Sequence, residues 1–116
     1  MKMYCYKKCS TCKKAIKFLQ ENNIVVELID YTEQPLTYVE IAAYYEMSKQ
    51  DIKSFFNTSG LLYRKLNLKT ALPTMQHTEK IELLAEHPML IKRPLLVGSD
   101  FVLIGFKEKT WQEKLL

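Results

Sequence analysis

The sequence predicts an α/β domain built on a four-stranded mixed sheet. Residues 1–30 read as strand, helix and strand, and the residues after 94 read as strand, turn, strand and helix, with only helical patterns between them. The chain has 116 residues, of which 47% are hydrophobic and 26% charged, and this suits one domain over residues 1–116. No apolar run approaches the ~20 residues that cross a membrane, and no signal-peptide pattern is present. We therefore expect a cytoplasmic protein with no membrane association.

The first 30 residues predict a β-α-β unit. Residues 2–6 alternate and are rich in aromatic side chains, which is typical of a short strand. A helix to about residue 21 follows, which Ser10 and Thr11 help to cap and Asn22-Asn23 ends. Residues 24–30 form a second strand, parallel to the first. One face of the helix carries the apolar residues Cys12, Ala15, Ile16 and Leu19.

Residues 36–88 are predicted to be a helical insert. Pro35 and Thr37 open its first helix, a short helix begins near Ser48, a third lies around residues 63–66 before a loop, and another runs from Thr78 to about residue 86. Residues 95–97 and 101–104 then form a β-hairpin, and a last helix covers about residues 110–116. The inward face of the first insert helix is expected to hold Leu36, Val39, Ala42 and Ala43.

Basic residues are concentrated near the N-terminus. The net charge is +4, and residues 1–20 contain six lysines and no acid, which leaves 11 basic and 13 acidic residues in the rest of the chain. This pattern indicates either a site for an anionic ligand or a solvated lysine face. The aromatic residues are not interleaved with these lysines as in RNA-binding motifs, so we expect no direct contact with nucleic acid.

Three cysteines lie close together in the sequence: Cys5, Cys9 and Cys12. Their odd number and the expected reducing compartment argue against a disulfide framework. Cys9-Ser10-Thr11-Cys12 is a C-x-x-C pair, which is either half of a zinc site or a redox motif. Zinc would need two more ligands from Cys5, His77 and His87, and no second paired motif exists, so we expect no metal.

The position of the pair favours redox chemistry. Cys9 lies at the start of the predicted helix, where free N–H groups, the helix dipole and neighbouring lysines favour a thiolate. Cysteines of C-x-x-C motifs in such places have pKa values of ~3.5–7.5. Cys12 faces the core, so the motif supplies one attacking and one resolving thiol. Cys5 is expected to be a small buried apolar residue.

Four segments together point to a known family: YKKCSTCKKA at 6–15, FNTSGLLYRKL at 56–66, MLIKRPL at 89–95 and GFK at 105–107. They span most of the chain, and in this order they resemble the arsenate reductase / Spx family, especially short Spx-like members from Gram-positive bacteria. The resemblance implies a thioredoxin-like four-stranded mixed sheet, in the order β-α-β then β-β-α, with an inserted helical subdomain.

The resemblance also implies roles for individual residues. Cys9 would be the nucleophile, with Cys12 as its redox partner, and Pro94 would match a cis-proline beside it. Arg93 and Arg64 match arginines that bind an oxyanion in arsenate reductases, for which a planar guanidinium is well suited. The substrate site would further include Lys107, Ser10 and Thr11.

Two departures from the arsenate reductases bear on function. In those enzymes Gly-Thr-Ser typically follows the cysteine and a glutathione-type partner resolves the intermediate, whereas Cys12 here allows an internal disulfide. Lys107 replaces a third arginine and cannot match its fork geometry. We therefore expect a thiol–disulfide oxidoreductase that acts on a small disulfide or on an oxyanion such as arsenate. It would have no bound cofactor and would use glutathione or a thioredoxin-type reductant as co-substrate.

Two other functions stay open. One is an Spx-like redox-sensing regulator that binds the RNA polymerase α subunit, and the other is a redox-inert binding module. The chain ends at Leu116, directly after the last predicted helix, so we expect no tail for a degradation signal of the Spx kind. The two cysteines and the flanking lysines argue against an inert module. We expect a monomer.

Overall fold

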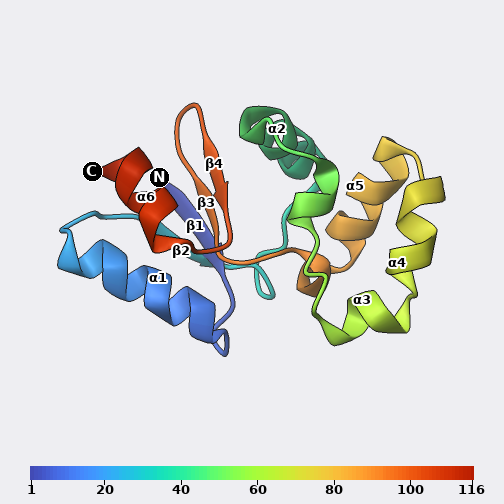
Figure 1. The fold of residues 1–116 in the computed structure, drawn as a ribbon, viewed down its shortest axis with the longest axis horizontal. Helices are drawn as coiled ribbons and strands as arrows, with labels where there is room; N and C mark the ends of the chain where they lie inside the picture. Colours follow the sequence, from blue (N-terminus) through green and yellow to red (C-terminus); the bar gives the residue numbers. More distant parts are fainter.

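A computed structural model describes residues 1–116 and places a mixed sheet beside a group of helices (Figure 1). The strands lie in the order β2-β1-β3-β4, with β1 parallel to β2 and antiparallel to β3, and β3 antiparallel to β4. The predicted strand pattern is therefore present. The elements are β1 (Lys2–Cys5), α1 (Ser10–Glu21), β2 (Glu27–Asp30), α2 (Tyr38–Ser48), α3 (Leu61–Lys65), α4 (Leu68–Ala71), α5 (His77–Glu86), β3 (Leu95–Val97), β4 (Val102–Ile104) and α6 (Glu108–Leu115).

Strand β2 is shorter than the predicted 24–30. Its first paired residue, Glu27, lies opposite Lys2, the first residue of β1. Residues 24–26 therefore have no β1 residue beside them, and a strand without a partner cannot form ladder hydrogen bonds. The apolar run at 24–26 predicted a strand, whereas the first residue of β1 determines where pairing begins.

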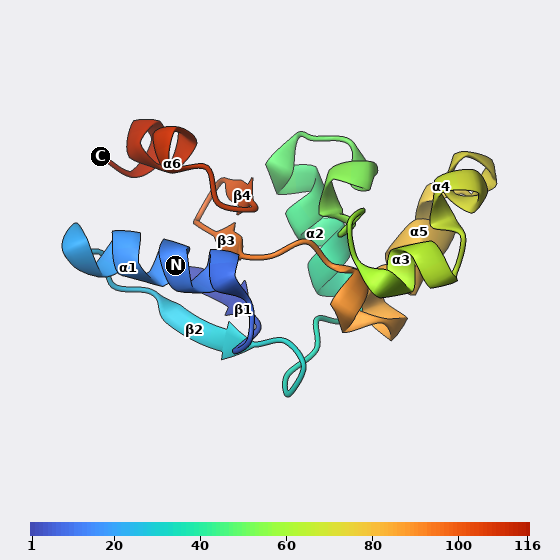
Figure 2. The same ribbon diagram turned by 60° about the horizontal axis from the view of Figure 1, so that its bottom comes forward.

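Alternate residues of the strands face two separate apolar clusters. Met3, Cys5 and Leu96 pack with α1 and with Trp111 of α6. Tyr4 and Leu95 face the other way, into a larger cluster shared with the helical insert. Helices therefore cover both faces of the sheet, α1 and α6 on one and the insert on the other, as Figure 2 shows. This alternation follows from the period of two along a strand.

The first insert helix begins as predicted but buries a different face. Thr37 caps α2 through a capping box, in which its hydroxyl accepts from the Glu40 N–H and the Glu40 carboxylate accepts from the Thr37 N–H. The prediction that Val39 and Ala43 face inward is wrong, since both are exposed and the buried residue is Ile41. The apolar residues of this stretch mark no single face, so packing against α5 decided the orientation.

Several insert boundaries also differ from the predictions. Ser48 ends α2, and the next turn is a 3-10 turn at Ile52–Phe55 capped by Asp51. A loop was predicted after residue 66, but α4 forms there and is followed by a 3-10 turn at Leu72–Thr74. Burial of Leu68 and Leu72 holds these short helices in place. None of the helices is long and apolar enough to span a bilayer.

Candidate functional site

The loop between β1 and α1 places Cys9 at the helix N-terminus. Cys9 is the residue before the first helical residue, and its sulfur accepts a hydrogen bond from the Cys12 N–H at 3.4 Å. Ser10 and Thr11 were expected to help with capping, but Ser10 is already the first residue of α1. The capping side chain must precede the helix, so Cys9 takes that position itself. Its half-buried thiol thus meets a free N–H group of the helix start.

Cys9 opens into a cavity of about 840 Å³. The walls come from the β1–α1 loop, the segment 57–62, Met89, residues 92–93 and residues 104–107. Four of the lining residues are cationic and none is acidic; the cations are Lys8, Lys92, Arg93 and Lys107. Ser10 and Thr11 also line it. The cavity therefore presents a positive surface to whatever approaches Cys9, which suits an anionic group.

Arg93 is held at this cavity by two tyrosines. Its Nη1 donates a 2.9 Å hydrogen bond to the Tyr31 hydroxyl, and its Cζ lies 5.5 Å from the centroid of the Tyr6 ring. Burial by itself lowers the pKa of Arg93, but the neighbouring Tyr31 and Cys9 side chains outweigh it, so the pKa is raised. The guanidinium therefore stays charged within reach of the Cys9 sulfur. Its buried Nε has no hydrogen-bond partner.

The strand that follows Arg93 supports the opposite wall. The Arg93–Pro94 peptide bond is cis, as the family resemblance implied, and Pro94 is buried. Its carbonyl accepts a hydrogen bond from the Gly105 N–H at 2.8 Å. Gly105 has a φ of 72°, in the left-handed region where an L side chain is disfavoured. The chain turns there, and this brings Lys107 to the cavity.

Cys12 is 1% exposed and lies in the apolar cluster that includes Met3, Leu96 and Trp111, which we call the α1 cluster. The neighbouring Cys5 side chain, and next in size burial, raise the pKa of the Cys12 thiol well above its usual value. The side chain of Cys9 acts in the opposite direction. Cys12 is therefore a neutral buried thiol that shares its cluster with Cys5 and lies next to Cys9.

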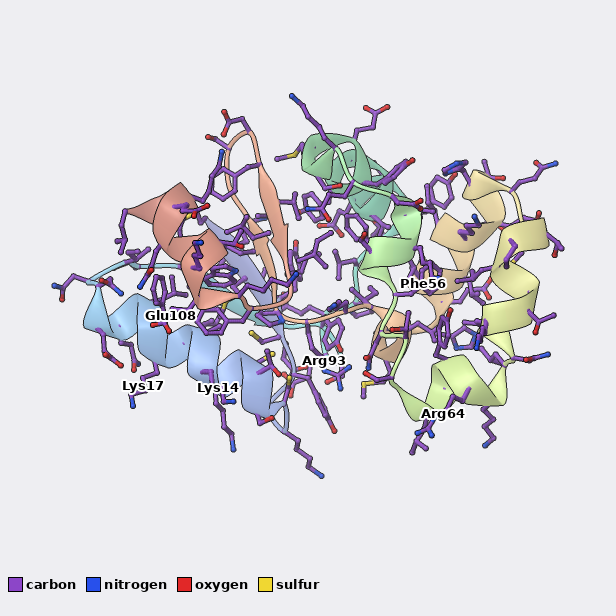
Figure 3. All side chains as sticks on the ribbon, viewed as in Figure 1. Lys14, Lys17, Phe56, Arg64, Arg93 and Glu108 are labelled. Atoms are coloured by element: carbon purple, nitrogen blue, oxygen red, sulfur yellow. The ribbon has the colours of Figure 1, made fainter.

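Arg64 is not brought to this site. It lies on α3, is exposed and does not line the cavity, although Leu61 and Leu62 before it do. Figure 3 shows Arg93 between the sheet and the insert, while Arg64 projects from α3 away from it. The reason is the helix period, because the neighbouring Tyr63 is the inward residue of α3 and packs on Phe56.

Sequence reasoning missed Tyr31, Lys92 and Asn57 as parts of the site. Tyr31 comes directly after the second strand and Lys92 lies next to Arg93, but neither position has a local pattern of its own. Asn57 was seen only as part of a turn and of the family motif. Cysteine, histidine and carboxylate side chains nowhere form a group of three that could hold a metal ion.

Comparisons with known proteins agree with this geometry. The model of the ArsC family matches residues 4–114. The chain is 49% identical over 110 residues to the uncharacterised protein YusI of Bacillus subtilis, covering 95% of this chain and 93% of that one. It is 27% identical over 106 residues to the global transcriptional regulator Spx of Enterococcus faecalis, covering 91% and 79%.

A solved structure shows the same architecture. The crystal structure of a possible arsenate reductase from Streptococcus mutans is similar with a TM-score of 0.86 and 38% identity, over 96% of each chain. This likeness and the family match confirm the predicted thioredoxin-like sheet with its inserted helices. By sequence and by fold, this chain is a member of the ArsC family.

Proposed function

We propose that the chain is a thiol–disulfide oxidoreductase in which Cys9 is the attacking thiol and Cys12 the resolving thiol. One observation carries the proposal. A half-buried thiol at a helix N-terminus faces a cavity with four cations and no acid, and a second, buried thiol lies one helical turn behind it. Membership of a family with arsenate reductase-like structural neighbours supports this class of chemistry.

The reaction begins at Cys9. As a thiolate it attacks one sulfur of a small disulfide, forms a mixed disulfide and expels the other half as a thiolate. Cys12 then attacks the Cys9 sulfur, which forms the Cys9–Cys12 disulfide and releases the second half of the substrate as a thiolate that takes up the Cys12 proton. The substrate gains two electrons and the two cysteines lose them. Glutathione or a thioredoxin-type protein, as co-substrate, restores the dithiol by the reverse exchange.

The cationic walls would select an anionic substrate. Arg93 and Lys107 would hold its negative group, and Ser10 and Thr11 in the first turn of α1 would complete the contact, with Pro94 packed behind. Arsenate is a second substrate candidate for the same position. Cys9 would displace one arsenate oxygen as water, and attack of Cys12 on the Cys9 sulfur would form the disulfide and release arsenite, which carries the two electrons. The cavity of about 840 Å³ also has room for a much larger group, such as a small peptide disulfide. Arg64 is left outside this assignment because it does not line the cavity.

Trapping the first intermediate tests the proposal. The Cys12→Ser variant, incubated with oxidised glutathione, should keep one glutathionyl group on Cys9, read as a mass increase of the intact chain and located by peptide mapping. Cys9→Ser is the matched control, because it leaves Cys12 buried and should trap nothing. An adduct on Cys12, or equal labelling of both variants, would show that Cys9 is not the attacking thiol.

A second candidate function is a redox-sensing regulator of the Spx kind, and the similarity to Spx over 91% of this chain favours it. In that case the chain should bind the C-terminal domain of the RNA polymerase α subunit, the partner that the family resemblance implies. A pull-down of that purified domain by the reduced and the oxidised chain separates the two functions. Retention that depends on the oxidation state would support a regulator, and no retention would leave the oxidoreductase ahead.

A further inference from the structure

The α1-facing side of β1 carries a third cysteine next to the C-x-x-C pair. Met3 and Cys5 point to this side, whereas Tyr4 between them points to the insert. Cys5 is the last residue of β1 and is 8% exposed. Cys5 and Cys12 belong to one buried cluster, against which Cys9 also packs. The three cysteines thus lie in or against one buried cluster where β1 ends and α1 begins, although they do not form a metal-binding group.

Cys12 is the central member of this group. It shares the buried cluster with Cys5, and its backbone N–H donates a 3.4 Å hydrogen bond to the Cys9 sulfur. Cys9 differs from the other two because it alone lines the cavity. The group therefore comprises one thiol at the cavity and two buried thiols, which share their cluster with Ala15, Leu96 and Trp111.

We propose that Cys5 is a third redox thiol, which forms a disulfide with Cys12 after Cys12 has resolved the adduct on Cys9. This inference rests on the proposed function. In the added step the Cys5 thiolate attacks the Cys12 sulfur of the Cys9–Cys12 disulfide. The Cys5–Cys12 bond forms, the Cys9–Cys12 bond breaks, and Cys9 leaves as a thiolate while the Cys5 proton passes to solvent. No electrons leave the chain, so the step needs no further oxidant.

The exchange has a consequence that a two-cysteine motif does not have. The disulfide moves to two residues that are 8% and 1% exposed, and Cys9 becomes free again at the cavity. The oxidised chain can then bind a second substrate molecule as a mixed disulfide. With excess oxidised glutathione, the end state holds one internal disulfide and one glutathionyl group on Cys9.

The positions of the lysines make this end state easy to identify. Trypsin cleaves after Lys2, Lys7, Lys8 and Lys13, which puts Cys5 in the peptide 3–7 and both other cysteines in the peptide 9–13. A Cys9–Cys12 disulfide is a loop inside the second peptide. A Cys5–Cys12 disulfide instead joins the two peptides, and the joined pair should also carry the glutathionyl group on Cys9.

The experiment treats the full chain with excess oxidised glutathione, quenches it with acid, alkylates the free thiols under denaturing conditions and maps the peptides without reduction. We expect the joined peptides with glutathionylated Cys9 as the main oxidised form. Cys5→Ser should lose the joined form and the lasting adduct together and keep only the loop. If Cys5→Ser does not fold, Cys5→Ala and Cys5→Val should give the same loss.

The outcomes separate this inference from the proposed function. A wild-type chain that yields only the loop, with Cys5 alkylated, would overturn the role of Cys5 and leave the oxidoreductase standing, provided that Cys12→Ser still traps an adduct on Cys9. No adduct in Cys12→Ser would overturn both. A peptide pair joined through Cys9 instead of Cys12, as fragmentation would reveal, would also exclude the proposed transfer.

Discussion

Arg93 Nη1 donates a 2.9 Å hydrogen bond to the hydroxyl of Tyr31, a residue 62 positions earlier in the chain. Tyr31 follows β2, at the far edge of the sheet from β4, and Arg93 precedes β3. Tyr31 is fully buried, and burial raises its pKa to about 12 although the charge of Arg93 acts against the rise. A neutral phenol thus fixes the guanidinium that faces Cys9.

Replacing this phenol tests whether the orientation of Arg93 matters. Tyr31→Phe keeps the ring but removes the acceptor, and a hydrogen bond to a charged group contributes ~1.5–3 kcal/mol. We expect the concentration of sulfate that protects Cys9 from alkylation to rise by about 3- to 10-fold, which is less than the full energy of that hydrogen bond would give. Tyr6→Phe is the matched control, because its ring still lies under the guanidinium, and it should behave like the parent. Equal protection in Tyr31→Phe and the parent would show that Arg93 is held without this bond.

The two arginines that the family resemblance selected should behave differently. Arg93→Ala removes a cation from the cavity, whereas Arg64→Ala changes an exposed residue outside it. For Arg93→Ala, we expect the concentration of arsenate, phosphate or sulfate that protects Cys9 from iodoacetamide to rise by about 10-fold or more. Arg64→Ala should stay within about twofold of the parent, as is usual for surface substitutions. Unchanged protection in Arg93→Ala would contradict the assignment of the anion site.

Alkaline pH should destabilise the reduced chain. The pKa of Cys12 is raised by the neighbouring Cys5 side chain and by burial, and burial raises that of Tyr31 to about 12. In the unfolded chain these groups titrate near ~8.5 and ~10. Above each of these values the unfolded state releases a proton that the folded state keeps, so the free energy of unfolding falls as pH rises. Each group contributes a slope of up to ~1.4 kcal/mol per pH unit.

Urea unfolding in the presence of a reductant measures this slope. The free energy of unfolding should begin to fall near pH ~8.5, where Cys12 of the unfolded chain titrates. It should fall more steeply above pH ~10, where Tyr31 of the unfolded chain titrates as well. Cys12→Ala removes the first group, so its stability should stay level until Tyr31 titrates, together with Tyr4, whose pKa burial also raises. A parent chain as stable at pH ~10 as at pH ~8 would contradict the raised pKa of Cys12.

Trp111 should matter for both stability and the cavity wall. Its Nε1 donates a 3.1 Å hydrogen bond to the Gly105 carbonyl, and its ring packs edge-on against the Phe106 ring, with 4.9 Å between the ring centroids. Trp111→Phe leaves that buried carbonyl without its partner and opens space in the α1 cluster, which should cost about 2–4 kcal/mol of unfolding free energy. Gln112→Ala, on the exposed side of α6, should change stability by less than about 0.5 kcal/mol. Thermal or urea unfolding compares the two variants.

Local patterns predicted most of the secondary structure. The alternation of residues 2–6, the helical stripe from Cys12 to Leu19 and the hairpin turn at Gly98 all depend on near neighbours, and the structure has an element at each place. The capping box at Thr37 is equally local. Ile41 and α4 were missed because burial against distant helices, rather than a sequence period, determines them.

The C-x-x-C pair and its place at a helix start were readable from the sequence by itself, because a strand, a loop and an amphipathic helix follow one another within 21 residues. Only the tertiary structure decided which distant side chains join Cys9. Packing of the insert against the sheet brings Arg93 to Tyr31 and leaves Arg64 on an outer surface. The pleat of β1 turns Cys5 toward Cys12. Both results depend on the direction in which packed elements point their side chains, and a linear pattern does not contain that direction.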